Sequence, residues 1–136
     1  MTALLSKRIV MAFTALYCGA VAAELGPEEL SSLVKGRKWL IAVQGNLSHA
    51  GHAAYWDFNA DGSVCPRFGG SKPNDQCADE GQWKLDGQTL CWELKRIGEQ
   101  YGQKSACVQV KKVSDTDYEA HNIKGGFRQF VFRPVK

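Results

Sequence analysis

The sequence predicts an all-β protein with one short helix near its start and about eight antiparallel strands that form a lipocalin-like meander barrel. Apolar and polar residues alternate with a period of two over most of the chain after Gly36. The alternating segments are short, and most are separated by tight turns such as Asp86-Gly87. Closing such a meander into a barrel also removes the exposed edges of an open sheet.

The first 23 residues have the pattern of a secretory signal. Lys7 and Arg8 precede a mostly apolar stretch, residues 9–20, and small residues follow it. We therefore expect removal of residues 1–23, with residues 24–136 forming one secreted or periplasmic domain. The apolar stretch is about 12 residues long, short of the roughly 20 that span a bilayer, so no membrane span is expected.

Removal of this segment also changes the charge and the cysteine count. Loss of Lys7 and Arg8 lowers the formal charge from +3 to +1, which gives no support for a nucleic-acid partner. Cys18 is lost as well, and the bulky Tyr17 before it disfavours a lipid anchor at that position.

A helix is expected over residues 27–35. Pro27 suits the first helical position, and the two glutamates after it favour the positive end of the helix dipole. Leu30 and Leu33 fall at helical spacing, and Gly36 is a natural stop.

Eight strands follow, each with apolar side chains at alternate positions. They are expected over residues 38–43, 54–58, 63–67, 82–85, 89–94, 106–113, 118–123 and 127–133. Most connections are short turns, whereas a long loop over residues 68–80 contains Cys77.

Strand parity predicts how the four remaining cysteines pair. Cys91 and Cys107 each lie between inward-facing residues of consecutive strands, so both face outward and can meet. Cys65 is then left to pair with Cys77, and this disulfide connects the long loop to the strand that contains Cys65. Four cysteines allow three pairings, and a zinc site is the other alternative, although no Cys-x-x-Cys pair is present.

Oxygen-bearing side chains between residues 57 and 62 resemble the first half of a calcium loop. Asp57, Asn59 and Asp61 alternate before Gly62, but the twelfth position is Phe68, where a glutamate belongs. A strand end followed by a hairpin turn explains the same residues, and we expect no metal site.

Catalytic and cofactor patterns are weak throughout. His49 and His52 lie in a loop of small residues, and His121 lies on an expected strand. No serine occupies a Gly-x-Ser-x-Gly turn, no phosphate-binding loop is present, and the carboxylates of Asp79 and Asp117 are expected to be solvated in turns. We expect no catalytic residues and no cofactor, and therefore no enzyme.

The inward aromatic residues are the candidate ligand contacts. Trp39, Trp56, Trp92 and Phe130 lie at inward positions of four strands. In a barrel such residues fill the core or line a ligand cavity, and sequence alone does not distinguish the two.

Four segments occur in a characteristic order. Tyr55-Trp56-Asp57-Phe58-Asn59-Ala60-Asp61-Gly62 is followed by Gly81-Gln82-Trp83, by Leu90-Cys91-Trp92 and by Cys107. This order resembles small secreted bacterial proteins of lipocalin-like, uncharacterised families, although Gly36-Arg37-Lys38-Trp39 has one residue more than the Gly-x-Trp of true lipocalins. The resemblance implies a periplasmic barrel and carries over no catalytic residue.

Two functions follow as hypotheses. The first is a monomeric binding module for a small apolar ligand or an envelope component, suggested by the barrel and its inward aromatic residues. The second is a protein inhibitor of a secreted hydrolase, with the long loop over residues 68–80 as the contact surface.

Overall fold

The structure is a computed structural model that describes residues 23–42, 54–97 and 104–136. Most of the expected signal segment, as well as Val43, His49 and His52, lies outside these residues. In the described part, the elements are β1 (Ala23–Glu24), α1 (Pro27–Val34), β2 (Arg37–Ala42), β3 (Ala54–Phe58), β4 (Ser63–Pro66), β5 (Gly81–Asp86), β6 (Thr89–Leu94), β7 (Ser105–Lys112), β8 (Tyr118–Asn122) and β9 (Arg128–Pro134).

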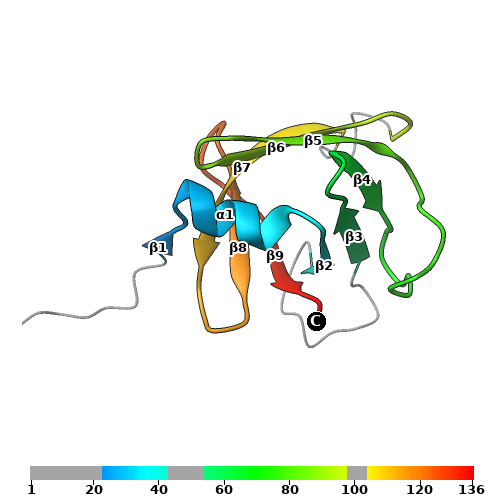
Figure 1. Cartoon of the computed structure of the whole chain (residues 1–136), viewed down its shortest axis with the longest axis horizontal. Helices are drawn as coiled ribbons and strands as arrows, with labels where there is room; N and C mark the ends of the chain where they lie inside the picture. The colour runs from blue at the N-terminus through cyan, green and yellow to red at the C-terminus, as the bar shows by residue number, and fades with distance from the viewer. Residues whose placement is uncertain (1–22, 43–53, 98–103) are drawn as a thin grey trace, which may run out of the picture.

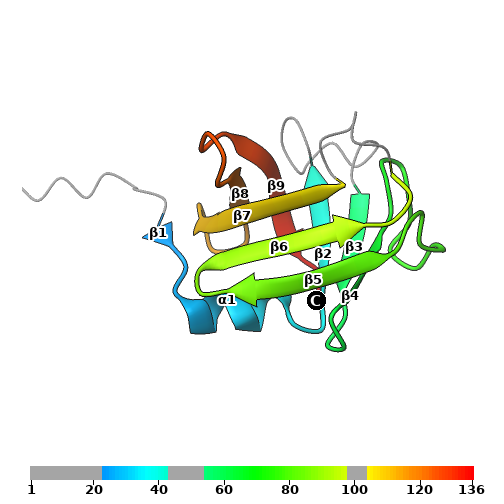
Figure 2. The same ribbon diagram turned by 90° about the horizontal axis from the view of Figure 1, so that it is seen from above.

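Strands β2 to β9 form a closed, eight-stranded antiparallel barrel. Each strand pairs with the next one along the chain, and β9 returns to β2, where Ile41 lies opposite Phe132. Figure 1 shows the strands as a ring, and Figure 2 shows β5, β6 and β7 side by side in one wall. The all-β meander barrel predicted from the period of two is confirmed.

Strand β1 was not expected from the sequence. It pairs with the end of β7, where Ala23 lies opposite Lys112, beyond the last pairing of β6 at Thr89 and Gln109. The amide of Leu25 continues the contact by donating to the carbonyl of Val110 at 3.2 Å. Two residues are too few to show alternation, so only their place beside β7 makes them a strand.

Helix α1 lies across the ring of strands (Figure 1). Its apolar face, Leu30, Leu33 and Val34, is buried in the same core as the inward strand residues. The indole Nε1 of Trp39 donates to the carbonyl of Leu33 at 2.9 Å, which fixes the helix end to β2. The helix ends one residue earlier than expected, and Gly36 then turns the chain with a φ of +70°.

Aromatic rings fill the centre of the barrel. Trp39 stacks on Phe132 with ring centroids 3.7 Å apart and contacts Phe58 at 4.4 Å. Trp92 contacts Trp56 at 5.6 Å and Phe130 at 6.0 Å. Large rings on facing strands thus supply much of the apolar burial that stabilises the barrel.

Both expected disulfides are present. Cys91 lies directly opposite Cys107 on the neighbouring strand, and the two are bonded. Cys65 at the end of β4 is bonded to Cys77 in the long loop. The pairing predicted from strand parity is confirmed.

Candidate functional site

The calcium-like segment forms a hairpin turn and an ion pair. Asp57 faces outward on β3, where Oδ2 lies 2.8 Å from Arg67 and Oδ1 lies 3.6 Å from Lys38. Asp61 accepts hydrogen bonds from the hydroxyl and the amide of Ser63, at 2.6 and 2.9 Å, and these bonds lower the pKa of its carboxyl. Within the described residues, no group of three or more His, Cys, Asp and Glu side chains could hold a metal ion.

His121 has both ring nitrogens engaged on the outside of β8. Nε2 lies 2.8 Å from the carboxylate of Glu119, and Nδ1 lies 3.2 Å from the carbonyl of Gly126. Arg128 adds a longer ion pair to the same glutamate at 3.8 Å. The arrangement ties β8 to the turn that follows it.

The four predicted ligand-contact residues lie together in the core. Trp39, Trp56, Trp92 and Phe130 are each at most 3% exposed and contact one another through their rings. None of them borders the pocket described next.

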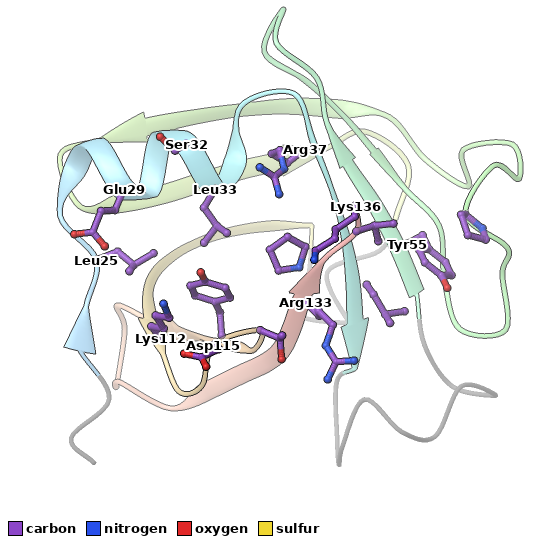
Figure 3. Close-up of a pocket in the computed structure, with 16 residues that line it drawn as sticks. Leu25, Glu29, Ser32, Leu33, Arg37, Tyr55, Lys112, Asp115, Arg133 and Lys136 are labelled. Atoms are coloured by element: carbon purple, nitrogen blue, oxygen red, sulfur yellow. The ribbon is translucent and has the colours of Figure 1, made fainter. Parts of the chain in front are cut away.

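A pocket of about 790 Å³ lies at the α1 end of the barrel, and we call it the α1 groove. Its volume falls within the range typical of small-molecule sites. Helix α1, the β7–β8 turn and the end of β9 border it (Figure 3). Its lining residues are Leu25, Glu29, Ser32, Leu33, Arg37, Leu40, Tyr55, Pro73, Lys112, Asp115, Thr116, Tyr118, Arg133, Pro134, Val135 and Lys136.

The floor of the α1 groove beneath the helix is apolar. Leu25 and Leu33 are buried parts of the core, and Tyr118 packs against it. The Tyr118 ring stacks on Phe132 with centroids 5.4 Å apart, which holds it in place. Figure 3 shows Leu25 and Leu33 on the helix side of this space.

Charged side chains stand around that floor, and among the described lining residues cations outnumber acids. The cations are Arg37, Lys112, Arg133 and Lys136, and the acids are Glu29 and Asp115.

Arg133 is engaged by a residue outside the lining. Its Nε and Nη2 donate to the two carboxylate oxygens of Asp117, at 2.7 and 3.2 Å. The hydrogen bond from Arg133 lowers the pKa of Asp117, so this carboxyl is not the freely solvated group that the sequence suggested.

The long loop is held to the barrel at several points, and we call residues 68–80 the clamped loop. The guanidinium of Arg67 is buried, and it donates from Nε to the carbonyl of Asp75 and from Nη1 to Asp57 at 2.8 Å. Lys38 donates to the carbonyl of Pro73 and to Asn74 at 3.0 Å. Together with the Cys65–Cys77 disulfide, these bonds fix a segment whose residues are mostly exposed.

Asp79 ends the clamped loop as a buried carboxylate. Its side chain is 1% exposed and accepts from the amides of Glu80 and Ile97 at 2.7 Å each, and of Arg96 at 3.1 Å. Burial alone raises the pKa of Asp79, but the three amide donors, together with the Arg96 side chain at 3.6 Å, outweigh it and the pKa lies below its usual value. The expectation of a solvated turn residue was wrong, because its partners lie on a distant loop.

Comparison with protein-family models, curated proteins and solved structures finds no match to this chain. The resemblance to lipocalin-like proteins therefore stays a prediction. No helix among the described residues is both long and apolar enough to cross a membrane.

Proposed function

We propose that this protein is a binding module rather than an enzyme, acting in the periplasm or outside the cell, and that it holds a small, largely apolar ligand in the α1 groove. The same site would accept the apolar part of an envelope component. Two disulfides fit the oxidising conditions of such a compartment.

The observation that carries the proposal is the α1 groove itself. It combines an apolar floor with a volume of about 790 Å³, which is within the range of small-molecule sites, and charged side chains stand around the floor. The floor residues Leu33 and Tyr118 are positioned by core contacts, so the groove needs little reordering to bind. The aromatic residues proposed from sequence pack against one another, so we place the ligand at the barrel end instead.

Binding of the neutral fluorophore N-phenyl-1-naphthylamine tests this site. Glu28 and Glu29 are consecutive, exposed residues in the first turn of α1, and only Glu29 borders the groove. Glu29→Trp places a ring in the groove, whereas Glu28→Trp makes the same change in charge and size outside it. We expect saturable binding by the wild type and about a tenfold weaker Kd for Glu29→Trp.

The Glu28→Trp variant should bind the fluorophore like the wild type. An absence of saturable binding by the wild type would refute the proposal. Equal or tighter binding by Glu29→Trp, compared with Glu28→Trp, would refute the placement of the ligand in the α1 groove.

A second function, inhibition of a secreted hydrolase, is favoured by the clamped loop. Arg67, Lys38 and the Cys65–Cys77 disulfide hold its backbone, while Lys72, Asn74 and their neighbours stay exposed. A loop held in one conformation loses less entropy when it binds a partner.

Two double variants test this second function against a panel of secreted serine proteases and lysozymes. Replacing Cys65 and Cys77 by alanine releases the loop, whereas replacing Cys91 and Cys107 removes a disulfide elsewhere. We expect the inhibition constant to rise at least about tenfold only in the first variant. Equal constants in both variants, or no inhibition by the wild type, would contradict an inhibitory loop.

A further inference from the structure

Three cations stand where inward rows of barrel residues reach the α1 end. The buried row of β7 runs through Val108 and Val110 and continues to Lys112, which is exposed. On β2, Trp39 is buried and the next position on the same face is the exposed Arg37. These side chains follow the inner face but lie beyond the filled core.

The pairing of β9 with β2 places Lys136 next to Arg37 in the strand register. Trp39 lies opposite Pro134, and the amide of Val135 donates to the carbonyl of Lys38 at 2.8 Å. The same antiparallel register brings residue 136 beside residue 37. Figure 3 shows Arg37 and Lys136 on the side of the groove away from Glu29 and Leu25.

Arg37 and Lys136 differ from Arg133, the other arginine of the groove, in their ion pairs. Arg133 is bonded to Asp117. In the part of the chain that the structure describes, no ion pair is recorded for Arg37, Lys112 or Lys136. The acids of the lining, Glu29 and Asp115, stand on the Lys112 side (Figure 3), so the Arg37 side is the electropositive one.

We propose that the α1 groove takes a single-chain amphiphile with an anionic head, a carboxylate or a phosphate monoester. The head lies at Arg37 and Lys136, and the apolar tail lies on Leu33 and Tyr118. This inference rests on the proposed function, to which it adds the class and the orientation of the ligand.

The chemistry of the two ends supports this orientation. A guanidinium offers paired N–H donors that match a carboxylate or a phosphate, and hydrogen bonds between charged groups are stronger than neutral ones. Both cations are exposed, so water and salt weaken their attraction for an anion. We therefore expect a head-group preference of about tenfold, on top of binding driven by the tail.

Isothermal titration calorimetry with four amphiphiles that are each built on a ten-carbon chain tests the proposal. Decanoate and decyl phosphate carry the anionic heads, decanol is neutral, and decyltrimethylammonium is cationic. The charged amphiphiles are used below their critical micelle concentrations, and decanol is used below its solubility limit. We expect both anions to bind about tenfold more tightly than decanol, and the cation to bind most weakly. Raising the salt concentration should reduce this preference but leave decanol binding intact.

Charge removal at the head position supplies the variant test. The double variant Arg37→Gln with Lys136→Gln should bind decanoate and decanol with similar affinity. The control Lys124→Gln, which removes one positive charge in the exposed turn between β8 and β9, should keep the preference of the wild type. A preference that survives the double variant would overturn the assignment of the head to these two residues.

The remaining outcomes separate this inference from the proposed function. Equal affinity of the wild type for decanoate and decanol would overturn the anionic head but leave an apolar site in place. Binding of inorganic phosphate as tight as that of decyl phosphate would overturn the role of the tail. No binding of any amphiphile, together with no binding of the neutral fluorophore, would overturn both the inference and the proposed function.

Discussion

Asp79→Asn should destabilise the protein more than any other isosteric change of a single carboxylate in the described residues. The carboxylate is 1% exposed and receives three amide donors, from Glu80, Arg96 and Ile97. It joins the end of the clamped loop to the segment after β6. An asparagine keeps one acceptor but turns its amide N–H groups toward backbone N–H groups.

The size of the effect follows from these three bonds. Hydrogen bonds to a charged group contribute about 1.5–3 kcal/mol each, and an unpaired buried amide costs a similar amount. Because asparagine can still accept one or two of these hydrogen bonds, we expect the free energy of unfolding to fall by about 3 kcal/mol. The total stability of a domain this size is about 5–15 kcal/mol, so the variant should fold and remain measurable.

Urea denaturation, followed by tryptophan fluorescence with the disulfides intact, provides the measurement. With a slope of about 2 kcal/mol per molar urea, the midpoint should fall by about 1.5 M at neutral pH. Glu80→Gln is the matched control, because Glu80 is exposed and its ion pair with Lys95 spans 3.6 Å between exposed side chains. Its midpoint should stay within about 0.3 M of the wild type.

The pH dependence gives a second, independent readout. The amide donors lower the pKa of Asp79 in the folded state, below the value of about 3.9 in an unfolded chain. The stabilisation by the carboxylate is therefore present above about pH 4 and is lost as the pH falls through the folded-state pKa. The difference between wild type and Asp79→Asn should shrink below pH 4. A midpoint change within the range of the Glu80→Gln control, or a difference that does not change with pH, would refute the reasoning.

Two further predictions concern the sheet. Gly81→Ala should lower the free energy of unfolding by about 3 kcal/mol, because a Cβ at this position would lie 2.0 Å from the carbonyl oxygen of Glu93. Gly87→Ala should lower it by about 1 kcal/mol, because the space there is open but φ is +58°. Chemical denaturation of both variants checks this order, and equal losses would contradict it. Replacing Cys91 and Cys107 together by alanine should cost about 3 kcal/mol in thermal denaturation, and an unchanged transition temperature would show that this disulfide adds no stability.

The strands and turns of the barrel could be predicted from the sequence because their determinants are local. The alternation of apolar and polar residues with a period of two indicates the strands. Asp86-Gly87 forms the expected hairpin turn, with Gly87 at a φ of +58°. The same period places Cys91 and Cys107 on the outward face of consecutive strands, where they can meet, and the observed register sets them directly opposite each other.

Sequence reasoning failed where the partner of a residue lies far along the chain. Asp79 looks like a solvated turn residue until Arg96 and Ile97 are brought to it, 17 and 18 positions away. Arg67 is likewise buried because it donates hydrogen bonds to the carbonyl of Asp75 and to the carboxylate of Asp57, and it thereby holds the clamped loop to β3. Such groups leave no periodic pattern, because their contacts depend on how loops cross in space.

The α1 groove shows the same division between local and tertiary determinants. By itself, the sequence determined the strands, the helix, the disulfide pairing and the inward aromatic residues, since each depends on periodicity or on neighbouring strands. Only the tertiary structure decided that those aromatic residues pack against one another and that Arg37 and Lys136 line the same groove as Leu33 and Tyr118. Barrel closure brings β9 back to β2, and this long-range pairing places the candidate site.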